Sequence, residues 1–211
     1  MKNFQPILAL LFVLASLFNC AAQPAYRIAS IVFTHLQPNG PDTISWSADR
    51  VLQPDDFTGS IPEREKKSDL LGAAATSFSF IINGHYDTSG YRMNICTGTF
   101  HYKSSSWIKT KGKLNDNTLA FEQMKFDLTK VYEIKFRKYL RDTTFTIDNI
   151  YERCNKIYYA AHAEYTDEMD RMYKDCRNVN RNIFSKKKFL EWKNKIAVEL
   201  KNYLTCDNSF D

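Results

Sequence analysis

The chain has 211 residues, of which 25% are charged and 44% hydrophobic, and its formal net charge is +5. This length fits one domain with a sizeable core, and no second domain is required. The cations form two short patches, residues 64–67 and 186–188, without an aromatic platform beside them. We therefore expect a solvated basic surface and no nucleic-acid partner.

The N-terminus has the pattern of a signal peptide. One cation, Lys2, precedes an apolar run over residues 6–18, and small residues follow at Cys20 and Ala22. The run is shorter than the roughly 20 residues that span a membrane, and no later stretch is apolar enough. We predict a signal peptide over residues 1–22, a single domain over residues 23–211, and a secreted or periplasmic protein without a transmembrane segment.

Cys20 leaves a second interpretation open. A cysteine after an apolar run can carry a lipid, which would anchor the protein on the cell envelope. The residues before it, Leu17, Phe18 and Asn19, are bulkier than a lipidation site usually accepts. We therefore favour ordinary cleavage over a lipid anchor at Cys20.

The N-terminal half has the pattern of strands and turns. Residues 26–36 and 43–46 are rich in strand formers, and residues 73–82 end in an alternating pattern before a predicted turn at Asn83 and Gly84. Further short strands are predicted over residues 91–102 and 107–108. A small antiparallel sheet is expected.

The C-terminal half changes to helical periodicity. Apolar side chains recur at steps of three and four in three segments, which predicts helices over residues 115–142, 146–172 and about 185–203. A sheet followed by helices gives the α+β class.

The cysteines of the predicted mature chain are four in number: Cys96, Cys154, Cys176 and Cys206. An even number in an oxidising compartment predicts two disulfides, with three connectivities open. No CxxC pair is present, which argues against a thiolate zinc site.

Residues 121–125 have the frame of an HExxH zinc-peptidase motif. Glu122 stands where the motif has its glutamate, but Phe121 and Lys125 stand where it has its two metal-binding histidines. Phenylalanine cannot bind a metal, and lysine is a rare zinc ligand. We expect no bound metal or other cofactor. Lys125 either pairs with Glu122, three residues before it on the same helix face, or points to solvent.

The segment is one of several that resemble a family of secreted bacterial proteins, domain of unknown function 922, described as zinc-dependent proteases. The matching segments keep the family's order: Trp46-Ser47, residues 52–59 with an Asp-Phe-x-Gly turn, residues 73–76, Ser106-Trp107-Ile108, residues 121–128, residues 135–138, and residues 173–179 and 190–196. The resemblance spans about residues 43–204 and implies a zincin-like fold. It also implies a third metal ligand at the position of Val179, which cannot bind metal either.

Other chemistries lack their motifs. The four histidines, His35, His85, His101 and His162, do not pair at ligand spacing, and no nucleophile elbow, Walker loop or dinucleotide fingerprint is present. Tyr151, Tyr158 and Tyr165 recur every seven residues in the second helix. Such a stripe either binds a peptide or glycan or packs in the core with its hydroxyls at the rim.

Three functions remain open. The first is a secreted, non-catalytic relative of a zinc protease that binds an unknown protein or peptide. The second is an active hydrolase with an unconventional site around Glu122 and another carboxylate, such as Asp127 or Glu168. The third is a structural module of the envelope. The loss of all three implied metal ligands favours the first, so catalysis is not expected.

Overall fold

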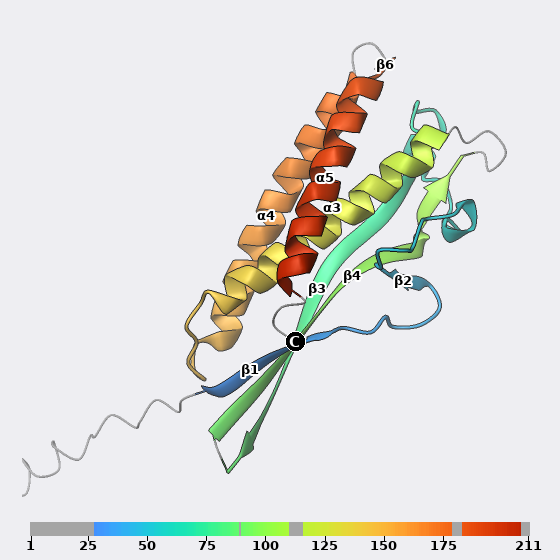
Figure 1. Cartoon of the computed structure of the whole chain (residues 1–211). Coiled ribbons are helices and arrows are strands. Elements are labelled where there is room, and N and C mark those ends of the chain that lie inside the picture. The colour runs from blue at the N-terminus through green and yellow to red at the C-terminus, as the bar shows by residue number, and fades with distance from the viewer. Residues whose placement is uncertain (1–27, 89, 110–115, 179–182, 208–211) are drawn as a thin grey trace, which may run out of the picture.

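The computed structural model describes residues 28–88, 90–109, 116–178 and 183–207 (Figure 1). In chain order its elements are β1 (Ile28–His35), β2 (Thr43–Ser45), η1 (Pro54–Asp56), α2 (Glu63–Lys66), β3 (Gly72–Asp87), β4 (Gly90–Ile108), α3 (Asp116–Arg141), α4 (Ile150–Cys176), β5 (Arg177–Asn178), β6 (Ile183–Phe184) and α5 (Lys186–Asp207). The predicted α+β class is confirmed. The short elements η1, α2, β5 and β6 were not predicted.

Strand β4 is the centre of the four-stranded sheet. Strand β3 pairs antiparallel along nearly the whole of β4, so that β1 and β2 share the opposite edge. β2 runs antiparallel to β4, but β1 runs parallel to it. The prediction of an antiparallel sheet is therefore wrong for β1. Because β2 and β3 lie between β1 and β4 in the sequence, no hairpin fixes the direction of this pair.

The predicted turn at Asn83 and Gly84 is also wrong, because β3 continues through both residues to Asp87. Gly84 has no positive φ, unlike Gly40 and Gly90. A Cβ atom on Gly84 would lie 1.9 Å from the hydroxyl oxygen of Tyr91. This glycine therefore makes room for a tyrosine ring across the strands rather than for a turn.

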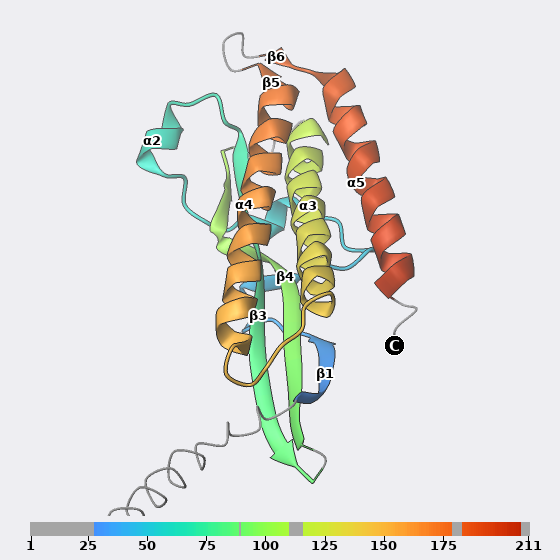
Figure 2. The same cartoon turned by 90° about the vertical axis from the view of Figure 1, so that its left-hand side faces the viewer.

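The three long helices cover one face of the sheet (Figure 1). Helix α3 contacts β3 and β4 on one side and α4 and α5 on the other, and Figure 2 shows it between those two helices. Of the apolar side chains at helical spacing in α3, Tyr139 is half-buried and the others are buried: Phe121, Met124, Leu128, Val131 and Tyr132. The three predicted helices are thus confirmed, and α3 is the element that every layer packs against.

Helix α4 begins four residues later than predicted. The side-chain oxygen of Asn149 accepts a hydrogen bond from the backbone N–H of Thr146, at 2.9 Å, so residues 146–149 form a turn before the helix. None of the helices in the described ranges carries an apolar stretch long enough to cross a membrane.

The prediction of two disulfides is not met. Cys96, Cys154 and Cys176 are free thiols, and two bridges among four cysteines would need at least one between two of these three. Cys154 and Cys176 lie near opposite ends of α4, about 33 Å apart along the helix axis, far beyond disulfide reach. The side chain of Cys206 lies outside the described part of the structure.

The thiols should differ in reactivity. Burial raises the pKa of both Cys154 and Cys176 to about 11, so little reactive thiolate forms near neutral pH. Cys96 is only half-buried. In native protein, iodoacetamide should modify Cys96 first, and peptide mass spectrometry would measure the order. Equal labelling of all three in folded protein, or recovery of a bridged peptide among them, would contradict the structure.

Candidate functional site

Glu122 and Lys125 form an ion pair next to the edge strand. Glu122 is 3% exposed, and the Lys125 Nζ atom lies 2.7 Å from its Oε2 atom. Of the two orientations open for Lys125, the structure therefore has the one that pairs with Glu122. The i,i+3 spacing on α3 makes the contact, in which the carboxylate is buried and the Lys125 side chain is 17% exposed.

Both side chains of the pair form hydrogen bonds with the backbone of one residue of strand β3. The backbone N–H of Ala74 donates to Glu122 at 2.8 Å, and Lys125 donates to the backbone C=O of Ala74 at 3.2 Å. A neighbouring strand would offer an acceptor and a donor in the same way. The two charged side chains thus take the place of a strand at this point of the sheet edge.

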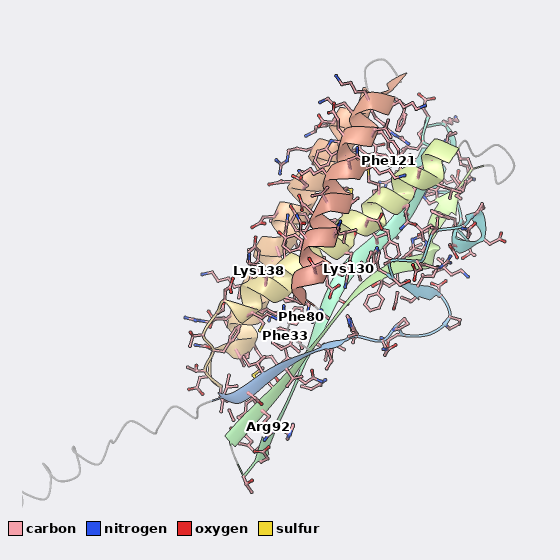
Figure 3. All side chains as sticks on the ribbon, in the orientation of Figure 1. Phe33, Phe80, Arg92, Phe121, Lys130 and Lys138 are labelled. Atoms are coloured by element: carbon pink, nitrogen blue, oxygen red, sulfur yellow. The ribbon has the colours of Figure 1, made fainter. Side chains whose placement is uncertain are left out.

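Phe121, the first position of the motif frame, lies in an apolar contact with the end of α4. Its ring is buried and meets Tyr173 at a centroid distance of 5.9 Å, and the guanidinium of Arg177 lies 5.6 Å from the same ring. Figure 3 shows Phe121 near the N-terminal end of α3. Val179, the implied third position, lies outside the described residues, two places beyond Arg177. No group of three or more potential ligands exists among the described residues.

A second cluster ties the loop after β2 to α3. The Asp127 carboxylate accepts hydrogen bonds from the indole N–H of Trp46 and the amide of Gln123, both at 2.9 Å. The Gln123 amide oxygen in turn accepts from the backbone N–H of Leu52 at 2.8 Å. Burial raises the pKa of Asp127, and these two hydrogen bonds oppose the shift.

The Asp-Phe-x-Gly segment fits against an irregularity in β4. A Cβ atom on Gly59 would lie 2.4 Å from the backbone oxygen of Ser104, so only glycine fits. The Ser106 hydroxyl fills the interruption in the ladder, accepting from Ala75 N–H at 2.9 Å and donating to Tyr102 C=O at 2.6 Å. Gly59 and Ser106, which both lie in segments that carry the resemblance, therefore meet at this irregularity of β4.

His101 lies beneath this segment as a buried, neutral side chain. Burial lowers its pKa, and its Nε2 atom lies 3.0 Å from the backbone oxygen of Asp56, to which it donates. The other ring nitrogen has no hydrogen-bond partner in the described part of the chain. The ring packs edge-on against Phe57 at 5.2 Å, which fits a core histidine better than a ligand.

The carboxylates considered as partners for Glu122 have other contacts. Asp127 is bound by Trp46 and Gln123, and Glu168 pairs with Lys195 of α5 and Arg171. Glu168 is also buried. The structure gives Glu122 neither carboxylate as a neighbour.

Sequence reasoning missed a buried charged cluster around Glu133. Its carboxylate accepts from the hydroxyls of Thr97 at 2.6 Å and Thr99 at 3.1 Å and pairs with Lys130. Burial alone would raise the pKa of Glu133, but Lys130, Thr97 and Arg137 hold it below its ordinary value. Lys130 and Glu133 have the same i,i+3 spacing as the first pair, which was the available signal.

The tyrosine stripe of α4 packs against the sheet and against α3 through its hydroxyls. Tyr158 donates to the backbone C=O of Phe78 at 3.2 Å, the Tyr165 hydroxyl lies 3.2 Å from that of Thr129, and Tyr151 bonds to Tyr91. Of the two interpretations of the stripe, these contacts favour packing over ligand binding.

Comparison with protein-family models, curated proteins and solved structures finds no match to this chain. The resemblance to domain of unknown function 922, and the zincin-like fold that it implies, therefore stay hypotheses.

The two isosteric amides Glu133→Gln and Asp127→Asn should change the pH dependence of stability in opposite directions. The depressed pKa of Glu133 gives stability that is present above its unfolded pKa of about 4.3 and is lost as pH falls through the folded pKa. The raised pKa of Asp127 gives stability that is present below about 3.9 and is lost as pH rises through the folded pKa.

Acidification from about pH 6 to about pH 3 should therefore destabilise Glu133→Gln less steeply than the natural protein, and Asp127→Asn more steeply. Urea unfolding at several pH values measures the slopes. Changes of the same sign in both variants would show that these two carboxylates do not titrate as their surroundings indicate.

Proposed function

We propose that this protein is secreted, has the framework of a zinc protease, and acts by binding a protein or peptide rather than by hydrolysis. The observation that carries the proposal is the buried Glu122–Lys125 pair on the backbone of Ala74. In a zinc peptidase the glutamate must reach a metal-bound water. Here its carboxylate is shielded from solvent and already accepts two hydrogen bonds.

Two further features support the proposal. Phe121 places a buried apolar ring, in contact with Tyr173 and Arg177, at the position where the motif has a metal-binding histidine. Several segments that carry the resemblance also lie together around the N-terminal half of α3, where hydrogen bonds join Trp46 to Asp127 and Leu52 to Gln123. A retained scaffold with replaced ligands is the simplest account of both.

An active hydrolase at Glu122 is the second candidate, and none of the contacts within the described residues favours it. A general base needs a substrate or water within hydrogen-bond reach. Lys125 and Ala74 take that place. An envelope-bound module stays open through Cys20, which lies outside the described residues.

The proposal predicts purified protein with far less than one zinc per chain. Casein and a peptide library should stay uncleaved with and without chelator, and added zinc should not raise the melting temperature. Elemental analysis, a cleavage assay and a thermal scan measure these outcomes. Stoichiometric zinc, or chelator-sensitive cleavage that Glu122→Gln abolishes, would support the hydrolase instead. Capture of library peptides without cleavage would support the binder.

The ion pair itself should stabilise the fold. Lys125→Met keeps the length of the side chain but leaves the Glu122 carboxylate buried without its cation, which we expect to cost about 2 kcal/mol. Lys188→Met is the matched control, because Lys188 and Glu191 form an i,i+3 pair of similar length, 2.8 Å, that is about half exposed. The control should leave the midpoint of urea unfolding almost unchanged. Equal effects would mean that the buried pair has no special role.

A further inference from the structure

The sequence contains two Asn-Gly dipeptides, Asn39-Gly40 and Asn83-Gly84. In such a pair the backbone nitrogen of the glycine can attack the side chain of the asparagine, because glycine has no Cβ atom to hinder the approach. The two dipeptides are identical in sequence. A difference in their reactivity therefore has to come from the folded structure around them.

Asn39 and Gly40 lie in the connection between β1 and β2, and both are exposed. Figure 1 shows this connection looping outward from the sheet. Within the described residues, no group bonds to the Asn39 side chain or to the N–H of Gly40. Gly40 has a φ of 93°, and nothing lies within 4 Å of the place that its Cβ atom would take. The attacking nitrogen and the side chain that it attacks therefore have room to approach each other.

Asn83, in contrast, is held in the ladder between β3 and β4. The C=O of Phe78 accepts a hydrogen bond from Tyr158, so it points away from β4. Pairing with β4 is unbroken from Phe78 to Asn83, and backbone groups alternate in direction along an antiparallel strand. The N–H and C=O of Asn83 therefore point to its partner on β4, Asn94, and the two residues exchange both hydrogen bonds.

This pairing opposes attack by the Gly84 nitrogen. To reach the side chain of Asn83, that nitrogen has to turn together with the whole peptide group, which includes the C=O of Asn83. The turn would break the hydrogen bond from the N–H of Asn94. The ring of Tyr91 also restricts the movement, because its hydroxyl oxygen lies 1.9 Å from the place that a Cβ atom of Gly84 would take.

We propose that Asn39 is a site of spontaneous deamidation in the folded protein, whereas the sheet protects Asn83. The Gly40 nitrogen loses its proton and forms a bond to the Cγ atom of Asn39. The side-chain nitrogen takes up a proton and leaves as ammonia, which closes a five-membered succinimide ring. Water then adds to one of the two ring carbonyls and breaks its bond to the Gly40 nitrogen, giving aspartate or isoaspartate. The proposal is independent of whether the chain binds or cleaves a substrate.

The modification changes the charge and the backbone at one surface position. The new carboxylate lowers the formal net charge of +5 by one, and isoaspartate adds a carbon atom to the backbone. Both changes fall between two anchored points. The Leu36 N–H donates to the C=O of Thr97 at 2.8 Å, and the Lys103 N–H donates to the C=O of Asp42 at 2.9 Å. The strands on either side should therefore keep their pairing.

Peptide mass spectrometry after long incubation of the full chain in mildly alkaline buffer tests the proposal. Trypsin releases residues 28–50 and 68–92 as separate peptides, and the only asparagine of each is Asn39 or Asn83. In native protein, Asn39 should deamidate at least about tenfold faster than Asn83, because attack at Asn39 breaks no hydrogen bond of the sheet. In guanidinium chloride, which unfolds the sheet, the two rates should become similar.

Asn39→Gln is the matched variant. It keeps an exposed side-chain amide, but the corresponding attack has to close a less favourable six-membered ring. The peptide of residues 28–50 should then stay unmodified, and the rate at Asn83 should not change. Equal rates at Asn39 and Asn83 in native protein, or a faster reaction at Asn83, would overturn the proposal. So would an Asn39 that reacts in denatured protein and stays intact in native protein.

Discussion

The structure depends on the contact between α3 and β3, the strand at the edge of the sheet. Two side chains of α3, Glu122 and Lys125, hold the N–H and C=O of Ala74 as a strand would. A buried backbone group without a partner costs on the order of 1–3 kcal/mol, so this contact lets the helix pack directly over the strand. The rest of the helix follows from that placement, because its apolar residues then face the sheet on one side and α4 and α5 on the other.

The same helix carries a second buried carboxylate, Glu133, which pairs with Lys130 three residues before it. Figure 3 labels Lys130. Thr97 and Thr99 of β4 supply the hydroxyls that a buried carboxylate needs. The two ion pairs differ in what they bind, since one holds an edge strand and the other the central strand. Together the two ion pairs hold α3 in one position on the sheet, because a shift of the helix would leave their charges unpaired in an apolar layer.

The sequence could predict the elements whose pattern is local. The apolar steps in α3, α4 and α5 gave the helices, and the strand formers gave β1 to β4. Prediction from the sequence failed where a tertiary contact decides the structure. Gly84 is typical of a turn, but in the structure it makes room for the ring of Tyr91. The parallel direction of β1 and the free thiols of Cys154 and Cys176 likewise depend on the tertiary arrangement, which no local pattern encodes.

The candidate site shows the same division. The spacing of Glu122 and Lys125 made an ion pair one of two open outcomes, but nothing in the sequence pointed to Ala74 as its third member, 48 residues from the glutamate. That third member is what changes the chemistry. A glutamate paired only with a lysine could release it and act on a substrate, whereas one that also accepts a strand's N–H must break a structural bond to do so. The pair therefore belongs to the architecture of the sheet edge, and further along that edge Tyr158 of α4 donates to the C=O of Phe78.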